Sequence, residues 1–131
     1  SFLSIDKYFA ELELLISSFF IVSAYNLNID RKTVDIAFIS GIIEFRDGTT
    51  LDFKEFIDST RYGIEKYKYA YNYRMSSDII FRYDNAPDPM AKRIKTFPHH
   101  KHIKSGEIIE SKQMDLRKVL EEIETIYNIK E

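Results

Sequence analysis

The stretch KYKYAYNYR, residues 66–74, alternates tyrosine with polar or small residues. Successive side chains of a β-strand point to opposite faces of a sheet, so this pattern predicts a strand with Tyr67, Tyr69, Tyr71 and Tyr73 on one face. Such a row can be the core-facing side of an antiparallel strand, or a platform on which nucleobases stack. We favour the core-facing interpretation, because the row then belongs to a half-buried antiparallel sheet.

The segments before this strand indicate further strands and one short helix. Residues 20–28 are rich in β-branched and aromatic residues, and Asp-Gly within residues 46–49 is a strong hairpin signal, because it tolerates the positive φ angles of a type I′ turn. The apolar phase shifts next to Gly41, which predicts a β-bulge. Asp52 and Glu55 have capping-box spacing, so we predict a short crossover helix from there to about Ser59.

Both ends of the chain show helical periodicity. Residues 4–18 and the stretch from Leu116 to Ile126 carry apolar side chains at intervals of three and four, the pattern of a helix with one buried face. After the tyrosine strand, short apolar runs at 79–81 and 108–109 predict further strands. We therefore predict one α+β domain over residues 1–131, a mostly antiparallel β-sheet flanked by an N-terminal and a C-terminal helix on one face.

The composition excludes several classes of protein. Apolar residues make up 44% and charged residues 31% of the chain, as in soluble globular domains. No apolar run reaches the roughly 20 residues of a transmembrane helix, and no secretory signal pattern is visible, so we expect no membrane partner. The chain has no cysteine, which excludes disulfides and thiolate metal sites and fits a reducing compartment. We expect a cytoplasmic protein.

All three histidines fall in TFPHHKH, residues 96–102, inside a basic segment. Five cations and no acid lie between Lys92 and Lys104, although the formal net charge of the chain is −2. Such a patch can hold a phosphate-bearing partner, which makes Arg93, Lys95 and Lys101 candidate substrate-binding residues. With its prolines, the segment 86–105 is predicted to be a long ordered loop. The alternative is a solvated surface loop without function.

The histidine spacing is compatible with two chemistries. In an extended segment His100 and His102 project to one side, and His99 and Lys101 to the other. His-x-His is a metal-ligand spacing, and Asp84 is the nearest third ligand in the sequence.

The second chemistry needs no metal. RNA cleavage by the 2′-hydroxyl requires a base, an acid and a cation, and histidine suits either proton role. Arg82, Lys101 or Arg93 could stabilise the charge that develops on the phosphate. The structural alternative is that Asp84 and Asn85 make a turn and that the histidines are solvated.

Two motifs carry a resemblance to a known family. They are RYDNAP, residues 82–87, and TFPHHKH, residues 96–102, and together with the order of helices and strands they make the chain similar to the TumE-like toxins of prokaryotic toxin-antitoxin systems. The resemblance spans nearly the whole chain. It implies a toxin that a cognate antitoxin, usually a DNA-binding one, neutralises. The matching positions are the candidate catalytic residues Arg82, Asp84, Asn85, His99, His100 and His102.

The resulting hypothesis is a toxin that acts on RNA or another phosphate-bearing target, with ribonuclease as the enzyme class and a homo-oligomer as one possible assembly. It includes no cofactor. Two alternatives stay open: a non-catalytic regulatory module that binds nucleic acid or an acidic partner, and a small metalloprotein that holds a divalent metal through His-x-His.

Overall fold

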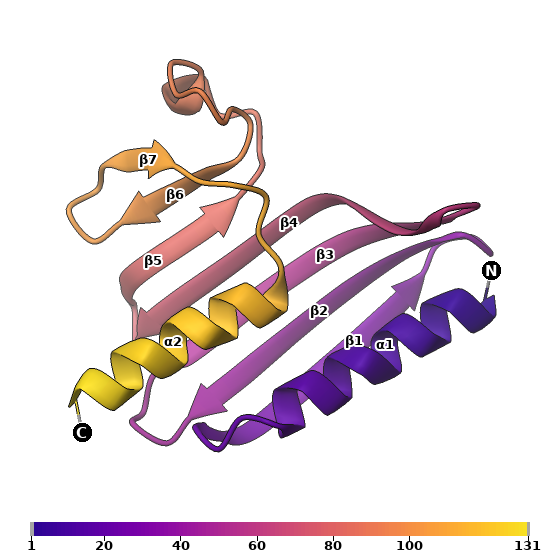
Figure 1. The fold of residues 1–131 in the computed structure, drawn as a ribbon, viewed down its shortest axis with the longest axis horizontal. Helices are drawn as coiled ribbons and strands as arrows, with labels where there is room; N and C mark the ends of the chain where they lie inside the picture. The colour runs from indigo at the N-terminus through magenta and orange to yellow at the C-terminus, as the bar shows by residue number, and fades with distance from the viewer. Residues whose placement is uncertain (1, 131) are drawn as a thin grey trace.

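Seven antiparallel strands form one sheet whose spatial order is the order of the chain (Figure 1). The computed structural model describes residues 2–130. Its elements are α1 (Phe2–Ser17), β1 (Val22–Arg31), β2 (Ile36–Phe45), β3 (Thr50–Thr60), β4 (Gly63–Met75), β5 (Asp78–Asp84), the 3-10 turn η1 (Pro89–Ala91), β6 (His100–Ile103), β7 (Ile108–Glu110) and α2 (Leu116–Lys130). The α+β prediction is confirmed. Neither helix is long and apolar enough to cross a membrane, within the described residues.

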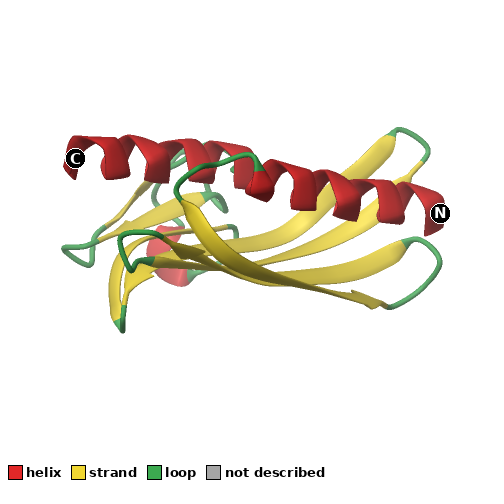
Figure 2. Ribbon diagram, turned by 90° about the horizontal axis from the view of Figure 1, so that it is seen from below, coloured by secondary structure: helices red, strands yellow, loops and turns green. Residues whose placement is uncertain are grey.

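Both long helices pack on the same face of the sheet (Figure 2). We call this the covered face and the opposite one the open face. The side chains that the helices contribute to the core are spaced at three- and four-residue intervals, as predicted: Ile5, Leu12 and Ile16 from α1, and Leu116, Val119, Leu120 and Ile123 from α2. The two helices thus seal one face only, and polar residues dominate parts of the other.

The tyrosine row lies mainly in the core. Tyr69, Tyr71 and Tyr73 are buried on the covered face, which confirms the core-facing interpretation for these three. Tyr67 differs: the register between β3 and β4 shifts beside it, and its side chain is 51% exposed. Its ring lies 5.9 Å from that of Phe56, so the extra residue turns Tyr67 toward the open face.

The predicted helix at 52–59 is wrong, because these residues belong to strand β3. Leu51, Phe53, Glu55 and Ile57 alternate as buried side chains on the covered face. Pairing with β2 and β4 on both sides satisfies the backbone and overrides the capping-box signal. Asp52 instead forms a two-point ion pair with Arg74 of the neighbouring strand, at 2.7 and 3.1 Å.

The predicted bulge at Gly41 is also wrong, since β2 pairs in continuous register through this residue with both neighbours. A Cβ at Gly41 would lie 2.5 Å from side-chain atoms of both Leu27 and Phe53. These two side chains fill the space on the covered face that a larger residue would need. The apparent phase shift arises because Phe38 lies on the open face, beside Phe56 at 4.6 Å.

The Asp-Gly hairpin between β2 and β3 is confirmed, but its turn is not type I′. Phe45 and Thr49 pair across three loop residues, and Gly48 has a φ of +87° while Asp47 has no positive φ. This is the three-residue loop in which a left-handed glycine follows a type I turn. The Asp47 carboxylate accepts hydrogen bonds from the backbone and hydroxyl of Thr49.

A buried carboxylate, Glu55, lies under the helices on the covered face. It accepts hydrogen bonds from the hydroxyls of Tyr8 and Tyr71, the latter at 2.5 Å, and the Lys66 ammonium lies 3.8 Å away. Burial and then the charge of Glu55 raise the pKa of the Tyr71 hydroxyl well above its ordinary value, so this hydroxyl stays a donor. Burial lowers the pKa of Lys66, and Glu55 opposes that shift.

Candidate functional site

Strands β5 and β6 bring the two sequence motifs together. Their antiparallel register sets Asp84 opposite His100 and Arg82 opposite His102. The predicted loop at 86–105 is therefore wrong for residues 100–103, because His100 and His102 lie in strand β6 and not in a loop. The four side chains alternate with residues of the covered face, so all four belong to the open face. We call them the Asp84 cluster.

Asp84 is the centre of the cluster and is nearly buried. Its Oδ1 accepts a hydrogen bond from the backbone N–H of Ala86 at 3.0 Å and lies 3.1 Å from His100 Nε2. Its Oδ2 accepts a hydrogen bond from Arg82 Nε at 3.0 Å and lies 3.3 Å from His102 Nε2. The carboxylate therefore joins both strands and both imidazoles.

The two imidazole rings face each other through their Nε2 atoms. His100 Nε2 and His102 Nε2 are 3.1 Å apart, and the ring of His100 is completely buried. His100 Nδ1 lies 2.7 Å from the carbonyl oxygen of Pro98, which fixes the orientation of the ring. The ligand atoms of Asp84, His100 and His102 all lie within 4.8 Å of one another, so these three residues could hold a metal ion.

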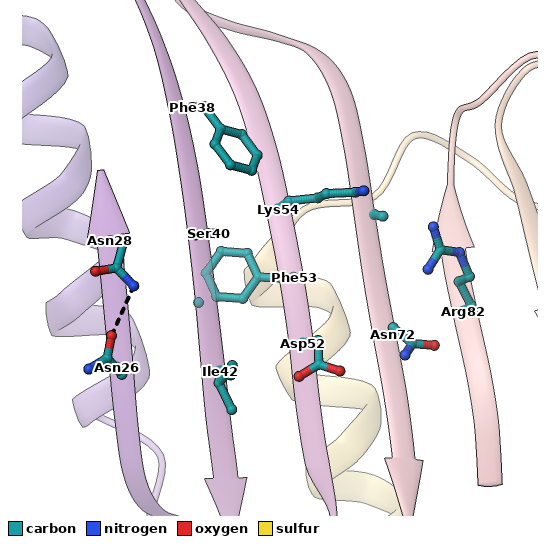
Figure 3. Close-up of a pocket in the computed structure, with 12 residues that line it drawn as sticks. Asn26, Asn28, Phe38, Ser40, Ile42, Asp52, Phe53, Lys54, Asn72 and Arg82 are labelled. Carbon is teal, nitrogen blue, oxygen red and sulfur yellow. Dashed lines mark hydrogen bonds between the residues drawn. The ribbon is translucent and has the colours of Figure 1, made fainter. Parts of the chain in front are cut away.

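The cluster is reached through Arg82 and His102, whose side chains are 34% and 29% exposed. Arg82 lines one end of a groove of about 450 Å³ that crosses the open face over strands β1 to β5 (Figure 3). Arg82 and His102 also line a second hollow beside the β6–β7 turn. Asn72 lies next to Arg82 in the groove, and its buried Oδ1 has no hydrogen-bond partner among the described residues.

Two of the predicted catalytic residues, His99 and Asn85, do not join the cluster. His99 lies beside Tyr69, with Nδ1 2.8 Å from the tyrosine hydroxyl. Burial, followed by the charges of His100 and Lys66, lowers the pKa of His99. The Asn85 side chain donates a hydrogen bond to the carbonyl of Tyr67 at 3.1 Å and accepts one from the backbone N–H of Tyr69 at 2.9 Å. These two bonds stabilise β4 where its register shifts.

Lys101 also points away from the cluster. Its Nζ lies 2.8 Å from Glu122 Oε2 of α2 and 4.9 Å from the ring centroids of both Phe81 and Tyr83, on the covered face. The other two predicted substrate-binding residues, Arg93 and Lys95, are exposed on the segment that connects Asp84 to His100. The sequence predicted which side chains lie on each face of β6, but not which residues of other elements contact Lys101 and His99.

The groove residues were missed by sequence reasoning. Asn26, Asn28, Lys54 and Asn72 come from strands β1, β3 and β4 and line the groove with Arg82 of β5. Each is an ordinary polar residue on the open face of its strand, so only the register shows that they are neighbours. An aromatic strip of Phe38, Phe56 and Tyr67 lies on the same face, and Phe38 borders the groove.

Comparison with known proteins gives one family. The family model described as Toxin TumE matches residues 11–127. No curated protein and no solved structure matches the chain. The match includes both motifs of the Asp84 cluster and all seven strands. Since the match covers most of the chain, the resemblance inferred from these motifs is confirmed, and the chain belongs to the family of TumE toxins.

Proposed function

We propose that this toxin acts on RNA and cleaves its phosphodiester bonds at the Asp84 cluster. One observation carries the proposal: a guanidinium, a carboxylate and two imidazoles converge on the open face, at the end of a groove. A cation beside titratable groups is the combination that phosphoryl transfer needs. On the covered face, a pocket of about 330 Å³ is lined by Tyr8 and Lys66 beside Glu55, whose partners are tyrosine hydroxyls and an ammonium instead of imidazoles.

The reaction requires proton transfer and charge stabilisation. The 2′-hydroxyl oxygen attacks phosphorus, the bond from phosphorus to the 5′-oxygen breaks, the 2′-hydroxyl proton passes to a base, and the 5′-oxygen takes up a proton. Arg82 is placed to stabilise the charge on the phosphate, because part of its side chain is exposed while Asp84 fixes its Nε. The proton transfers need either the free imidazoles or a water molecule on a bound ion.

The groove and the aromatic strip support a single-stranded substrate. The rings of Phe38 and Phe56 are 4.6 Å apart, those of Phe56 and Tyr67 are 5.9 Å apart, and Lys68 Nζ lies 5.5 Å from the centroid of Phe56. Tyr67 is exposed and Phe38 and Phe56 are half-buried, and accessible rings with an adjacent cation stack on unpaired bases. Lys54 is exposed in the groove between the strip and Arg82, where a phosphate backbone would pass.

The partner is a cognate antitoxin, because the chain belongs to a toxin family. We further propose a prokaryotic, cytoplasmic setting and an antitoxin that also binds DNA, as the family resemblance implies.

The test measures toxicity and RNA cleavage together. The wild-type chain, expressed alone in a bacterium, should arrest growth, and the cognate antitoxin should relieve the arrest. The purified chain should cleave a labelled single-stranded RNA of mixed sequence, and His102→Ala should abolish both effects. Lys101→Ala is the matched control, because it removes the neighbouring cation on the other face of β6. Growth arrest by His102→Ala at the wild-type level would refute the assignment of the site.

A further inference from the structure

The spacing of four atoms in the Asp84 cluster, the two Nε2 atoms of His100 and His102 and the two carboxylate oxygens of Asp84, fits the coordination shell of one metal ion. Two ligands bound at about 2.0–2.2 Å, at angles between tetrahedral and octahedral values, lie about 2.8–3.6 Å apart. The two Nε2 atoms are 3.1 Å apart, His100 Nε2 is 3.1 Å from Asp84 Oδ1, and His102 Nε2 is 3.3 Å from Asp84 Oδ2. All three separations fall in this interval.

The proton positions on His100 support the same interpretation. A carbonyl oxygen only accepts hydrogen bonds, so Nδ1 carries the proton that it donates to Pro98 at 2.7 Å. In neutral His100 the lone pair is then on Nε2, which faces His102 Nε2 and Asp84. Metal-bound histidines in proteins are held in this way, through the second ring nitrogen and a carbonyl or carboxylate.

Hydrogen bonds alone account less well for the contact between the imidazoles. With the proton of His100 on Nδ1, its Nε2 and Asp84 Oδ1 are two acceptors only 3.1 Å apart, and of the two Nε2 atoms only that of His102 can donate. An ion between the three residues removes this conflict, because both nitrogens then present lone pairs to one positive charge.

We propose that Asp84, His100 and His102 bind one divalent transition-metal ion of the Zn²⁺ or Mn²⁺ type, an inference that extends the proposed function by naming the cofactor of its site. Two imidazoles and one carboxylate favour such ions over Mg²⁺ and Ca²⁺, which prefer oxygen ligands. Three protein ligands leave further positions open, as in catalytic zinc sites. Arg82, bonded to Asp84 Oδ2, orients the carboxylate as an outer-shell partner.

The fold prepares this site before an ion arrives. Asp84 and His100 face each other across paired strands, and His102 lies two residues along on the same face. The backbone N–H of Ala86 and the Pro98 carbonyl fix two of the three ligands from outside. The exposed side of the site is formed by His102 and Arg82, so an ion or a substrate phosphate can enter from the second hollow.

The experiment titrates the metal-free chain with Zn²⁺, Mn²⁺ and Mg²⁺ by isothermal calorimetry, without RNA. We expect one Zn²⁺ or Mn²⁺ ion per chain with a dissociation constant in the micromolar range or tighter, no comparable binding of Mg²⁺, and a higher unfolding temperature with the bound ion. His102→Ala should weaken binding by at least about 100-fold, more than the loss typical of an outer-shell partner. Asp84→Asn provides a second variant.

His99→Gln is the matched control, because it removes an imidazole that lies next to His100 in the sequence but bonds to Tyr69. It should still bind one ion. Lack of binding by the wild-type chain, or unchanged binding by His102→Ala, would overturn the proposal. RNA cleavage that survives chelation would also overturn it while leaving the proposed function intact. Binding of one ion through His102 without any RNA cleavage would support the metal site and refute the proposed function.

Discussion

Two buried carboxylates lie on opposite faces of the same sheet, and their partners differ in kind. Glu55, on the covered face, accepts hydrogen bonds from two tyrosine hydroxyls, and the Lys66 ammonium, which donates to Tyr71 and the Met114 carbonyl, lies 3.8 Å away. Asp84, on the open face, has two firm donors, Ala86 N–H and Arg82 Nε, and two imidazole nitrogens that face each other as well.

The comparison separates a structural carboxylate from a candidate catalytic one. Burial does not distinguish them, because both side chains are almost inaccessible to solvent. The types of hydrogen-bond partner do: the raised pKa values of Tyr8 and Tyr71 keep the protons on the hydroxyls that donate to Glu55, whereas imidazoles exchange protons or bind metals. The environment differs too, since helices cover Glu55 while Asp84 lies beside the exposed Arg82 and His102. The predictions below test this contrast, in order of decreasing effect.

Asp84→Asn should lower the rate of RNA cleavage by about 10²–10⁴-fold, the range for loss of general acid–base catalysis, because both imidazoles and Arg82 are held by this carboxylate. Asparagine retains the shape and an acceptor for Ala86 N–H but loses the charge shared by both imidazoles. Thermal unfolding of the same sample should show a folded protein. A variant that cleaves RNA at the wild-type rate would remove Asp84 from the site.

Glu55→Gln should instead lower stability while leaving RNA cleavage intact. It leaves the buried Lys66 without a carboxylate, so the free energy of unfolding should fall by about 3–5 kcal/mol, measured by urea denaturation. The folded fraction should still cleave RNA. Asp52→Asn on the same strand is the control: its partly exposed pair with Arg74 should cost no more than about 1 kcal/mol. Equal losses in both variants would contradict the structural role of Glu55.

Removing the aromatic strip should weaken RNA binding more than it weakens the fold. The double variant Phe56→Ala, Tyr67→Ala should lose about 1–3 kcal/mol of affinity for each base that stacks there, measured by fluorescence anisotropy with labelled single-stranded RNA. Tyr62→Ala, an exposed ring at the β3–β4 turn, should leave affinity unchanged. If both variants bind RNA equally well, the substrate does not cross the strip.

Lys101→Ala should have the smallest effect. It removes a partly exposed ion pair with Glu122 and the contacts of the ammonium with two aromatic rings, which together contribute about 1 kcal/mol to stability. The slope of RNA affinity against salt concentration should not change, because the side chain points away from the groove. A slope reduced by about one unit would instead restore Lys101 as a phosphate contact, as the sequence suggested.

Much of the fold was predictable from local patterns. The helix stripes, the core position of Tyr69, Tyr71 and Tyr73 and the Asp-Gly hairpin follow from periodicity and turn chemistry. The strand at 52–59 was not predictable in this way. Its own residues carry a helix-capping signal, and pairing with β2 and β4 on both sides makes it a strand. Tyr67 lies outside the core because the register between β3 and β4 shifts beside it, and the sequence of one strand alone does not reveal such a shift.

The candidate site was predictable in its residues more than in its partners. Strand alternation separated His100 and His102 from His99 and Lys101. Proximity in the sequence indicated Asp84 as the candidate third ligand. The contacts of Lys101 with α2 and of Asn85 with β4 depend on how strands and helix meet, so the pattern of one strand could not supply them. The groove needed the register of five strands.

The order of the sheet has a consequence for how the chain folds during its synthesis. Since each strand pairs with the next one in the sequence, β1 to β4 can associate while later residues are still on the ribosome. The two histidines follow about a hundred residues into the chain, and α2, which helps to cover the core, comes last. We expect a nascent chain to lack the Asp84 cluster until β6 has been synthesised and has paired with β5, so a chain that carries only β1 to β4 has no candidate site.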